Sequence, residues 1–153
     1  MAPYISDGES NPISIVQGYA LRSLNWILPN MKISIDGGFE EGVEPVYVEK
    51  MMKLSTGNGF VTARMMVSCM DAIAEVRSHP DQWPADLPLL FIQGMKDMAT
   101  NGHINVAWAE KVKESAPDTV DIVMYEDATH QLPRIKCRGE LMRKALSFME
   151  SYL

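Results

Sequence analysis

The sequence predicts an α/β fold in which a helical region is followed by a strand–helix–strand–helix unit with parallel strands. Leu87–Ile92 is an unbroken apolar run, which is typical of a strand buried on both faces, and Val120–Tyr125 is a second candidate strand. Between them, charged residues are turned outward, and four apolar residues recur at helical spacing: Ile104, Ala107, Trp108 and Val112. A strand, a crossover helix and a strand in this order indicate a parallel pair.

The helical region begins with a capping signal at Ser10–Pro12, because asparagine can cap free amides and proline is tolerated at the first helical position. Five apolar residues then follow at helical spacing, before Leu28–Asn30 ends the pattern: Ile13, Val16, Ala20, Leu24 and Ile27. We therefore predict one amphipathic helix of about four turns.

Residues 30–44 contain three glycines and show no clear period, so we expect an irregular acidic loop. Pro45 opens a short helix, which residues 56–59 break. From Phe60 a longer helix is predicted, and it should stop near Ser78–Pro80 because the residue before proline avoids helical angles. The apolar face of this helix would consist of Met66, Cys69, Met70, Ile73 and Val76.

The second half of the chain continues with a helix start at Asn101, which can cap a helix that begins near Gly102. His103 in the first turn of that helix, like His79 beside Pro80, is predicted to be a surface residue. A final helix should pack back on the sheet through one apolar face, which consists of Ile135, Met142, Ala145, Leu146, Met149 and Leu153.

Asp97 and His130 follow the two predicted strands, each within a few residues of the strand end. Because such crossovers are right-handed, both side chains should leave the same edge of the sheet on neighbouring loops. A carboxylate beside an imidazole supplies two of the three groups of a Ser-His-Asp triad. The residues alone are also consistent with Asp97 as the cap of a turn and His130 as an ordinary loop histidine.

Two motifs resemble the last two strand–loop units of the α/β-hydrolases. Leu87–Asp97 ends in Gly-x-x-Asp, and Tyr125–Leu132 reads Tyr-x-x-Ala-x-His-Gln-Leu. The closer resemblance is to monoacylglycerol lipases and lysophospholipases, whose inserted cap ends in a helix similar to residues 59–64 onward. The resemblance covers nearly all of this chain but only the second half of the family's chain. It implies the end of a core strand and a linker at residues 1–9, a helical cap at 10–80, and the C-terminal part of the core at 81–153.

The resemblance implies that Asp97 is the acid and His130 the base of a serine hydrolase that acts on a lipid ester. Asp7 and Asp127 are rival acids, and Asp7 is the stronger rival because some hydrolases place the acid after the earlier strand. The family would also use cap residues to line a tunnel for an acyl chain, although core packing explains the same pattern equally well. These cap residues are Met65, Met66, Met70 and Ile73.

The nucleophile of such an enzyme is missing from the 153 residues. A nucleophile elbow requires Gly-x-Ser-x-Gly at a strand-to-helix turn, and the nearest string, Gly8–Pro12, lacks the second glycine. We therefore expect a chain that is inactive alone, and an in-frame Gly-x-Ser-x-Gly about 100 or more residues upstream of Met1. The alternatives are a non-catalytic lipid-binding or interaction protein of this fold, and another α/β-hydrolase such as an esterase or a serine aminopeptidase.

Composition narrows the choice of partners and compartment. The net charge is −6 with the acidic residues spread along the chain, so a nucleic-acid partner is not expected. Cys69 and Cys137 show no metal-binding spacing and are read as packing residues, and neither a metal nor a cofactor is expected. No apolar stretch approaches the ~20 residues that span a bilayer, and no leader is recognised. We expect a cytoplasmic protein, with peripheral attachment to membranes as an alternative.

The predicted strand pair also bears on assembly. Two or three parallel strands leave edges without a partner, and the apolar edge at Leu89–Ile92 favours association with another chain. Besides a lipid ester or acyl chain, the expected partners are therefore the missing N-terminal half of the fold or a second copy of this chain.

Overall fold

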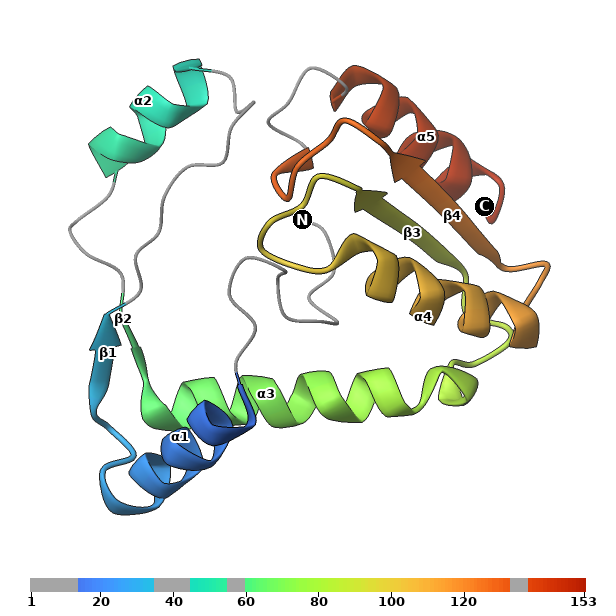
Figure 1. Cartoon of the computed structure of the whole chain (residues 1–153). Coiled ribbons are helices and arrows are strands. Elements are labelled where there is room, and N and C mark those ends of the chain that lie inside the picture. The colour runs from blue at the N-terminus through green and yellow to red at the C-terminus, as the bar shows by residue number, and fades with distance from the viewer. Residues whose placement is uncertain (1–13, 35–44, 55–59, 133–137) are drawn as a thin grey trace.

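The computed structural model describes residues 14–34, 45–54, 60–132 and 138–153. Its first portion, here called the helical part, contains α1 (Ile15–Ile27), β1 (Lys32–Ser34), α2 (Pro45–Leu54), β2 (Phe60–Thr62) and α3 (Ala63–Ser78). The second portion, the sheet part, contains η1 (Pro80–Gln82), β3 (Leu89–Gly94), α4 (Gly102–Ser115), β4 (Val120–Tyr125) and α5 (Arg138–Glu150) (Figure 1).

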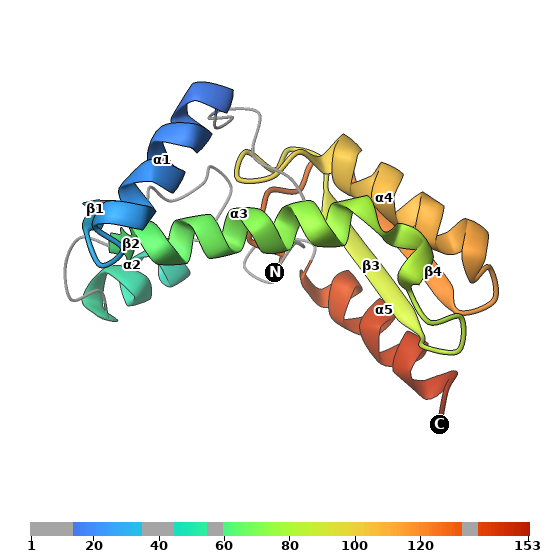
Figure 2. The same cartoon turned by 90° about the horizontal axis from the view of Figure 1, so that it is seen from below.

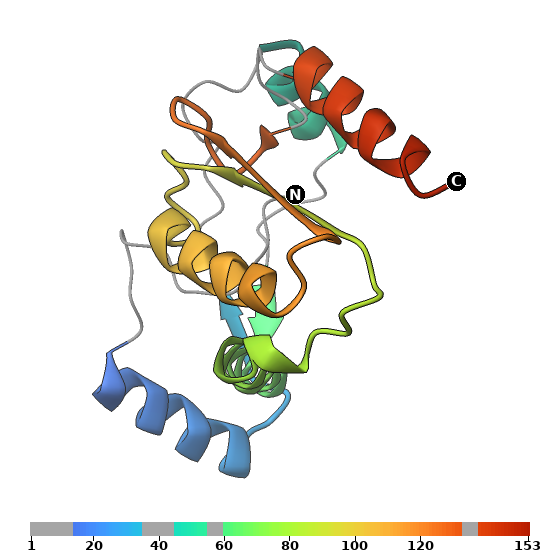
Figure 3. The same ribbon diagram turned by 90° about the vertical axis from the view of Figure 1, so that its right-hand side faces the viewer.

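The sheet part confirms the predicted α/β fold class. β3 and β4 are parallel, with Leu89 opposite Val120 and Gly94 opposite Tyr125. The two strands lie between α4 on one face and α5 on the other (Figure 3). β4 has the predicted bounds, whereas β3 begins and ends two residues later than its apolar run, because Pro88 has no amide to donate and Gln93 continues the pairing.

The core on one face of the sheet is formed by Phe91, Val120 and the inner side of α4. Trp108 and Val112 are buried as predicted, but Ile104 and Ala107 are exposed. The inner positions of α4 are instead Asn105, Trp108, Ala109 and Val112. The prediction was wrong about the phase of this helix because Asn105, a polar residue, turns inward to bond with polar groups of the sheet.

The prediction for α5 was also wrong about which face of the helix is buried. Leu141 is its buried residue and packs with Ala128 and Leu132, next to the partly buried Ile92 and Tyr125 of the strands. The predicted inner face is wrong for Met142, Leu146 and Met149, each about half exposed, and for Leu153, which is fully exposed. Ile135 and Cys137 lie outside the described residues. Leu141, Ala145 and Phe148 form a second apolar stripe at helical spacing, and this stripe faces the sheet.

The first helix of the helical part, α1, starts at Ile15, where Ser14 and Gln17 form a reciprocal capping box. The cap predicted at Ser10–Pro12, together with Ile13, lies outside the described residues. The helix predicted from Phe60 starts at Ala63, capped by the Thr62 side chain. Phe60–Thr62 is instead strand β2, which pairs antiparallel with β1 in the region predicted to be an irregular loop. Pairing between segments this far apart in the chain leaves no local periodic signal in a three-residue strand.

α3 connects the two parts of the molecule. α1 packs against α3 (Figure 2), and Arg22 of α1 forms an ion pair at 2.5 Å with Asp71, near the middle of α3. At the C-terminal end of α3, the Trp108 side chain donates a hydrogen bond from Nε1 to the carbonyl oxygen of Val76, at 2.9 Å. α3 ends at Ser78, as predicted, but Cys69 and Val76 are exposed, and Ala63 and Val67 are its buried residues. In the described ranges, no helix has both the length and the apolarity to cross a bilayer.

Candidate active site

The loops that follow β3 and β4 are joined by backbone contacts. The amide of Met95 donates to the carbonyl oxygen of Tyr125 and the amide of Lys96 donates to that of Ala128, both at 2.9 Å. Gly94 permits this close approach, because a Cβ atom at its position would lie 2.5 Å from the carbonyl oxygen of Ala128 and 2.6 Å from that of Thr129. The absence of a side chain at Gly94 therefore allows the two loops to meet at the carboxyl edge of the sheet, where the backbone hydrogen bonds join them.

The two loops bring Asp97 and His130 into contact, as the sequence predicted. His130 Nδ1 lies 2.9 Å from Asp97 Oδ2. The Asp97 side chain is 0% exposed and that of His130 is 20% exposed. A carboxylate only accepts hydrogen bonds, so Nδ1 is the donor of this contact, and in the neutral form of such a ring the lone pair is on Nε2. This is the tautomer that a general base needs.

The Asp97 carboxylate is held by further donors from its own loop. Oδ1 accepts from the amides of Ala99 and Thr100, at 2.8 and 2.9 Å. Oδ2 accepts from the hydroxyl of Thr100 at 2.8 Å, in addition to His130. Both carboxylate oxygens therefore have hydrogen-bond donors although the side chain is buried. The arrangement fits an acid that orients an imidazole and balances the charge of the imidazolium.

Two more buried side chains complete the site, and the sequence analysis missed both. Gln93 and Asn105 are 0% exposed, and Asn105 Nδ2 donates to Gln93 Oε1 and to Thr100 Oγ1, both at 3.0 Å. A signal for Asn105 is present in the sequence, because 105, 108 and 112 share one helical face on which asparagine is the polar exception. A polar residue on an apolar face requires a buried partner.

Asp127, one of the two rival acids, does not replace Asp97 in this geometry. Asp127 is 90% exposed and its carboxylate pairs with Lys96 Nζ at 2.6 Å. The hydrogen bond from Lys96, and then its positive charge, lower the pKa of Asp127 below the ordinary value. Asp7 lies outside the described residues. His103 is exposed as predicted, whereas His79 is half-buried beside Trp83.

The predicted cap residues lie along α3 and come before the acid–base pair in the sequence. Met65 is exposed, and Met66, Met70 and Ile73 are half-buried. The Met70 methyl group lies 3.6 Å from the place that a Cβ on Gly18 would occupy, so this side chain packs against α1. Met70 therefore contributes to packing between the two helices, and the lining of an acyl tunnel stays a prediction.

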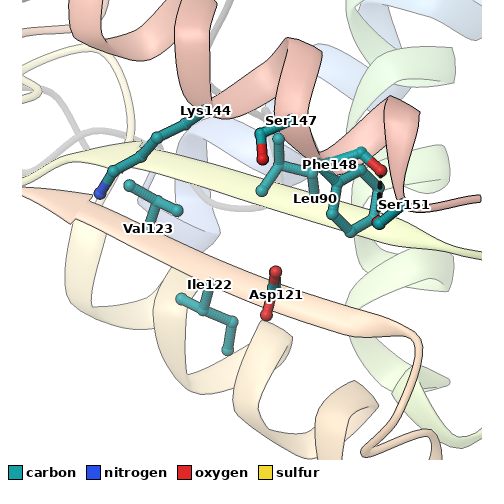
Figure 4. Close-up of a pocket in the computed structure, with 8 residues that line it drawn as sticks. All are labelled: Leu90, Asp121, Ile122, Val123, Lys144, Ser147, Phe148 and Ser151. Atoms are coloured by element: carbon teal, nitrogen blue, oxygen red, sulfur yellow. Dashed lines mark hydrogen bonds between the residues drawn. The ribbon is translucent and has the colours of Figure 1, made fainter.

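Two pockets lie away from the acid–base pair. One, of about 460 Å³, separates α5 from the strands and is lined by Lys144, Ser147, Phe148 and Ser151 of α5 and by Leu90, Asp121, Ile122 and Val123 (Figure 4). The other, of about 250 Å³, lies where α3, η1 and α4 meet, and is lined by Glu75, Val76, His79, Gln82, Trp83, Pro84 and Trp108. Neither pocket is lined by Asp97 or His130. Within the described part of the chain, no cluster of three His, Cys, Asp or Glu side chains could hold a metal ion.

The comparison with solved structures supports the fold that these motifs suggested. No protein-family model matches the sequence, and no curated protein is similar to it in sequence. The structure is similar to the crystal structure of the monoacylglycerol lipase of Paleococcus ferrophilus, with a TM-score of 0.75 over 94% of this chain. The fold is α/β-hydrolase-like. The chain spans 54% of the length of that lipase, and the sequence identity is 16%, so the likeness establishes the fold and not the activity.

Proposed function

We propose that this chain carries the acid and the base of a serine hydrolase of the monoacylglycerol lipase or lysophospholipase type, which cleaves a carboxylic ester of a lipid. The observation that supports this proposal is the 2.9 Å contact between a buried Asp97 and the Nδ1 atom of His130. The α/β-hydrolase-like fold adds support, because α/β-hydrolases are among the folds on which Ser-His-Asp chemistry occurs.

In the proposed reaction, His130 Nε2 accepts the proton of a serine hydroxyl as the serine oxygen bonds to the ester carbonyl carbon. The imidazolium then returns that proton to the alkoxide of the departing alcohol, and an acyl-enzyme remains. Water is activated by Nε2 in the same way, and its attack releases the fatty acid and regenerates the serine. Asp97 holds the ring and stabilises its positive charge in both steps.

The serine and the oxyanion-hole amides must come from polypeptide outside these 153 residues, since no Gly-x-Ser-x-Gly occurs in them. Among the described strands, β3 and β4 pair only with each other, so the second edge of either strand is where a strand from that polypeptide would add. An N-terminal extension, a separate chain or a second copy of this chain could cover that edge. The chain by itself is expected to have no esterase activity.

The proposal is tested by assaying hydrolysis of monoacylglycerol and lysophospholipid. The enzyme in this assay is the protein encoded by the complete reading frame that contains this chain. His130→Ala is expected to lower kcat/KM by roughly 10⁴-fold or more, and Asp97→Asn by about 10⁴-fold. His103→Ala, an exposed histidine on α4, is the matched control and should leave the rate unchanged. Full activity of His130→Ala, or labelling of the isolated chain by a serine-directed phosphonate, would contradict the proposal.

A second candidate function, lipid binding without catalysis, is favoured by the surface of α1. Ile15, Val16, Tyr19 and Trp26 are all at least 70% exposed, and Trp26 is 87% exposed. An apolar helix side with an exposed tryptophan suits the interface of a membrane or lipid aggregate. This surface could also serve the hydrolase, by bringing it to its substrate.

Co-sedimentation of the chain with phosphatidylcholine vesicles tests the surface of α1. Trp26→Ser is expected to weaken binding about tenfold, because one large apolar side chain is lost from the contact. Ile104→Ser, which removes an exposed apolar residue from α4, is the control and should bind as wild type does. Equal binding by wild type and Trp26→Ser would exclude this role for α1.

A further inference from the structure

A cluster of three buried polar side chains is hydrogen-bonded to Asp97 of the acid–base pair. It consists of Gln93 at the end of β3, Thr100 in the following loop and Asn105 in the first turns of α4, and each is 0% exposed. Beyond Asn105, the inner face of α4 is apolar, with Trp108 and Val112 in the hydrophobic core. Burying an amide there is unfavourable unless its groups are hydrogen-bonded, so its contacts explain why it is tolerated.

The hydrogen bonds of this cluster connect Asn105 to Asp97 through Thr100 and Gln93. The Asn105 amide nitrogen, a donor only, donates to Thr100 Oγ1 and to Gln93 Oε1, both at 3.0 Å. Because the Thr100 oxygen accepts this bond, its single hydrogen is left to donate to Asp97 Oδ2, at 2.8 Å. The Gln93 amide nitrogen donates to the carbonyl oxygen of Gly94 at 2.8 Å and faces the same Oδ2 at 3.4 Å.

We propose that Asn105 is a positioning residue for the acid–base pair. Acting through Thr100 and Gln93, it fixes the plane of the Asp97 carboxylate so that Oδ2 points at His130 Nδ1. The consequence is that the ring keeps its proton on Nδ1 and presents Nε2 as the base. The catalytic meaning of this assignment rests on the hydrolase function proposed above, but the positioning itself can be measured without catalysis.

The substitution Asn105→Asp separates positioning from packing, because the two side chains have nearly the same shape. Both oxygens of the introduced carboxylate would accept only, so the Thr100 hydrogen would turn away from Asp97 toward the new carboxylate. A second negative charge would also lie close to Asp97. Asn101→Asp is the matched control, since it adds the same charge four residues away, at the N-cap of α4, where aspartate caps as well as asparagine does.

The experiment is NMR of the full chain labelled with ¹⁵N-histidine, which reports the tautomer of His130 and the proton shared with Asp97. Wild type and Asn101→Asp are expected to show a proton held on Nδ1. In Asn105→Asp, the population with the intact Asp97–His130 bond should fall about tenfold, the effect of losing one hydrogen bond to a charged group. Thermal unfolding of each variant establishes that it is folded.

A second pair of variants addresses the same path if Asn105→Asp does not fold. Thr100→Val keeps the shape but removes the hydroxyl donor, and should lose the Nδ1 proton signal, whereas Thr100→Ser should restore it. A wild-type tautomer in Asn105→Asp or in Thr100→Val overturns the proposal, as does an equal loss in either control. Because no turnover is measured, this result is independent of the hydrolase assay.

Discussion

The sheet part and the helical part differ in how much of their surface is used inside the chain. In the sheet part, α4 alone buries five residues, and the loops after β3 and β4 are tied by backbone and side-chain hydrogen bonds. In the helical part, α1 has no buried residue, and α3 has two. The contrast shows that the acid–base pair is fixed by the local structure of the sheet part, whereas α1 ahead of it leaves apolar side chains exposed.

The largest effect on stability is expected at Gly94, in the sheet part. Gly94→Ala should destabilise the chain by about 5 kcal/mol, because the new methyl group would lie within 2.6 Å of two backbone oxygens that cannot move without parting the loops. Chemical denaturation measures the loss. A change below about 1 kcal/mol would show that the two loops are not held as closely as the structure indicates.

The second test compares two tryptophans. Trp108→Ala should cost about 3 kcal/mol, because the ring is buried against Trp83 and Phe91 and its Nε1–H group bonds to Val76. Trp26→Ala on the exposed side of α1 should change the unfolding free energy by less than about 0.5 kcal/mol. Equal losses measured by denaturation would mean that α1 packs against the molecule through Trp26.

The third test compares Gly94 with Gly18, a glycine of the helical part. Gly18→Ala should stabilise the chain by about 0.5–1 kcal/mol, since it lies within α1 and its Cβ would meet only the Met70 methyl group at an ordinary 3.6 Å. A rise in the thermal midpoint is the expected readout. A fall would indicate that α1 and α3 pack more tightly than this distance allows.

The smallest effect concerns the exposed ion pair between Lys96 and Asp127. The pKa of Asp127 is lower in the folded chain than in the unfolded one, because Lys96 bonds to its charged form. Its contribution is therefore present above pH about 4 and is lost as the pH falls through the folded-state value. Asp127→Asn should lower the thermal midpoint slightly at pH 7 and not at pH about 2. A difference that persists in acid would have another cause.

The sequence was sufficient for β3, α4, β4 and α5 and for the contact between Asp97 and His130 at the sheet edge. The apolar run before Gly94, the helix after it and the strand at Val120–Tyr125 predicted a parallel pair. Because parallel strands end at the same edge, the loops that carry Asp97 and His130 are neighbours. These inferences succeeded because strand order and loop position follow from chain connectivity. They do not depend on the rotation of any helix about its axis.

The rotation of the helices was decided by tertiary packing. α5 carries two adjacent stripes at helical spacing, Leu141–Ala145–Phe148 and Met142–Leu146–Met149, and periodicity gives no reason to prefer either. Contact with Ala128 and Leu132 selects the first stripe. In α4, hydrogen bonding to Gln93 and Thr100 turns Asn105 inward and leaves Ile104 exposed. Which face of a helix is buried depends on the surface it meets, and that surface is assembled from residues outside the helix.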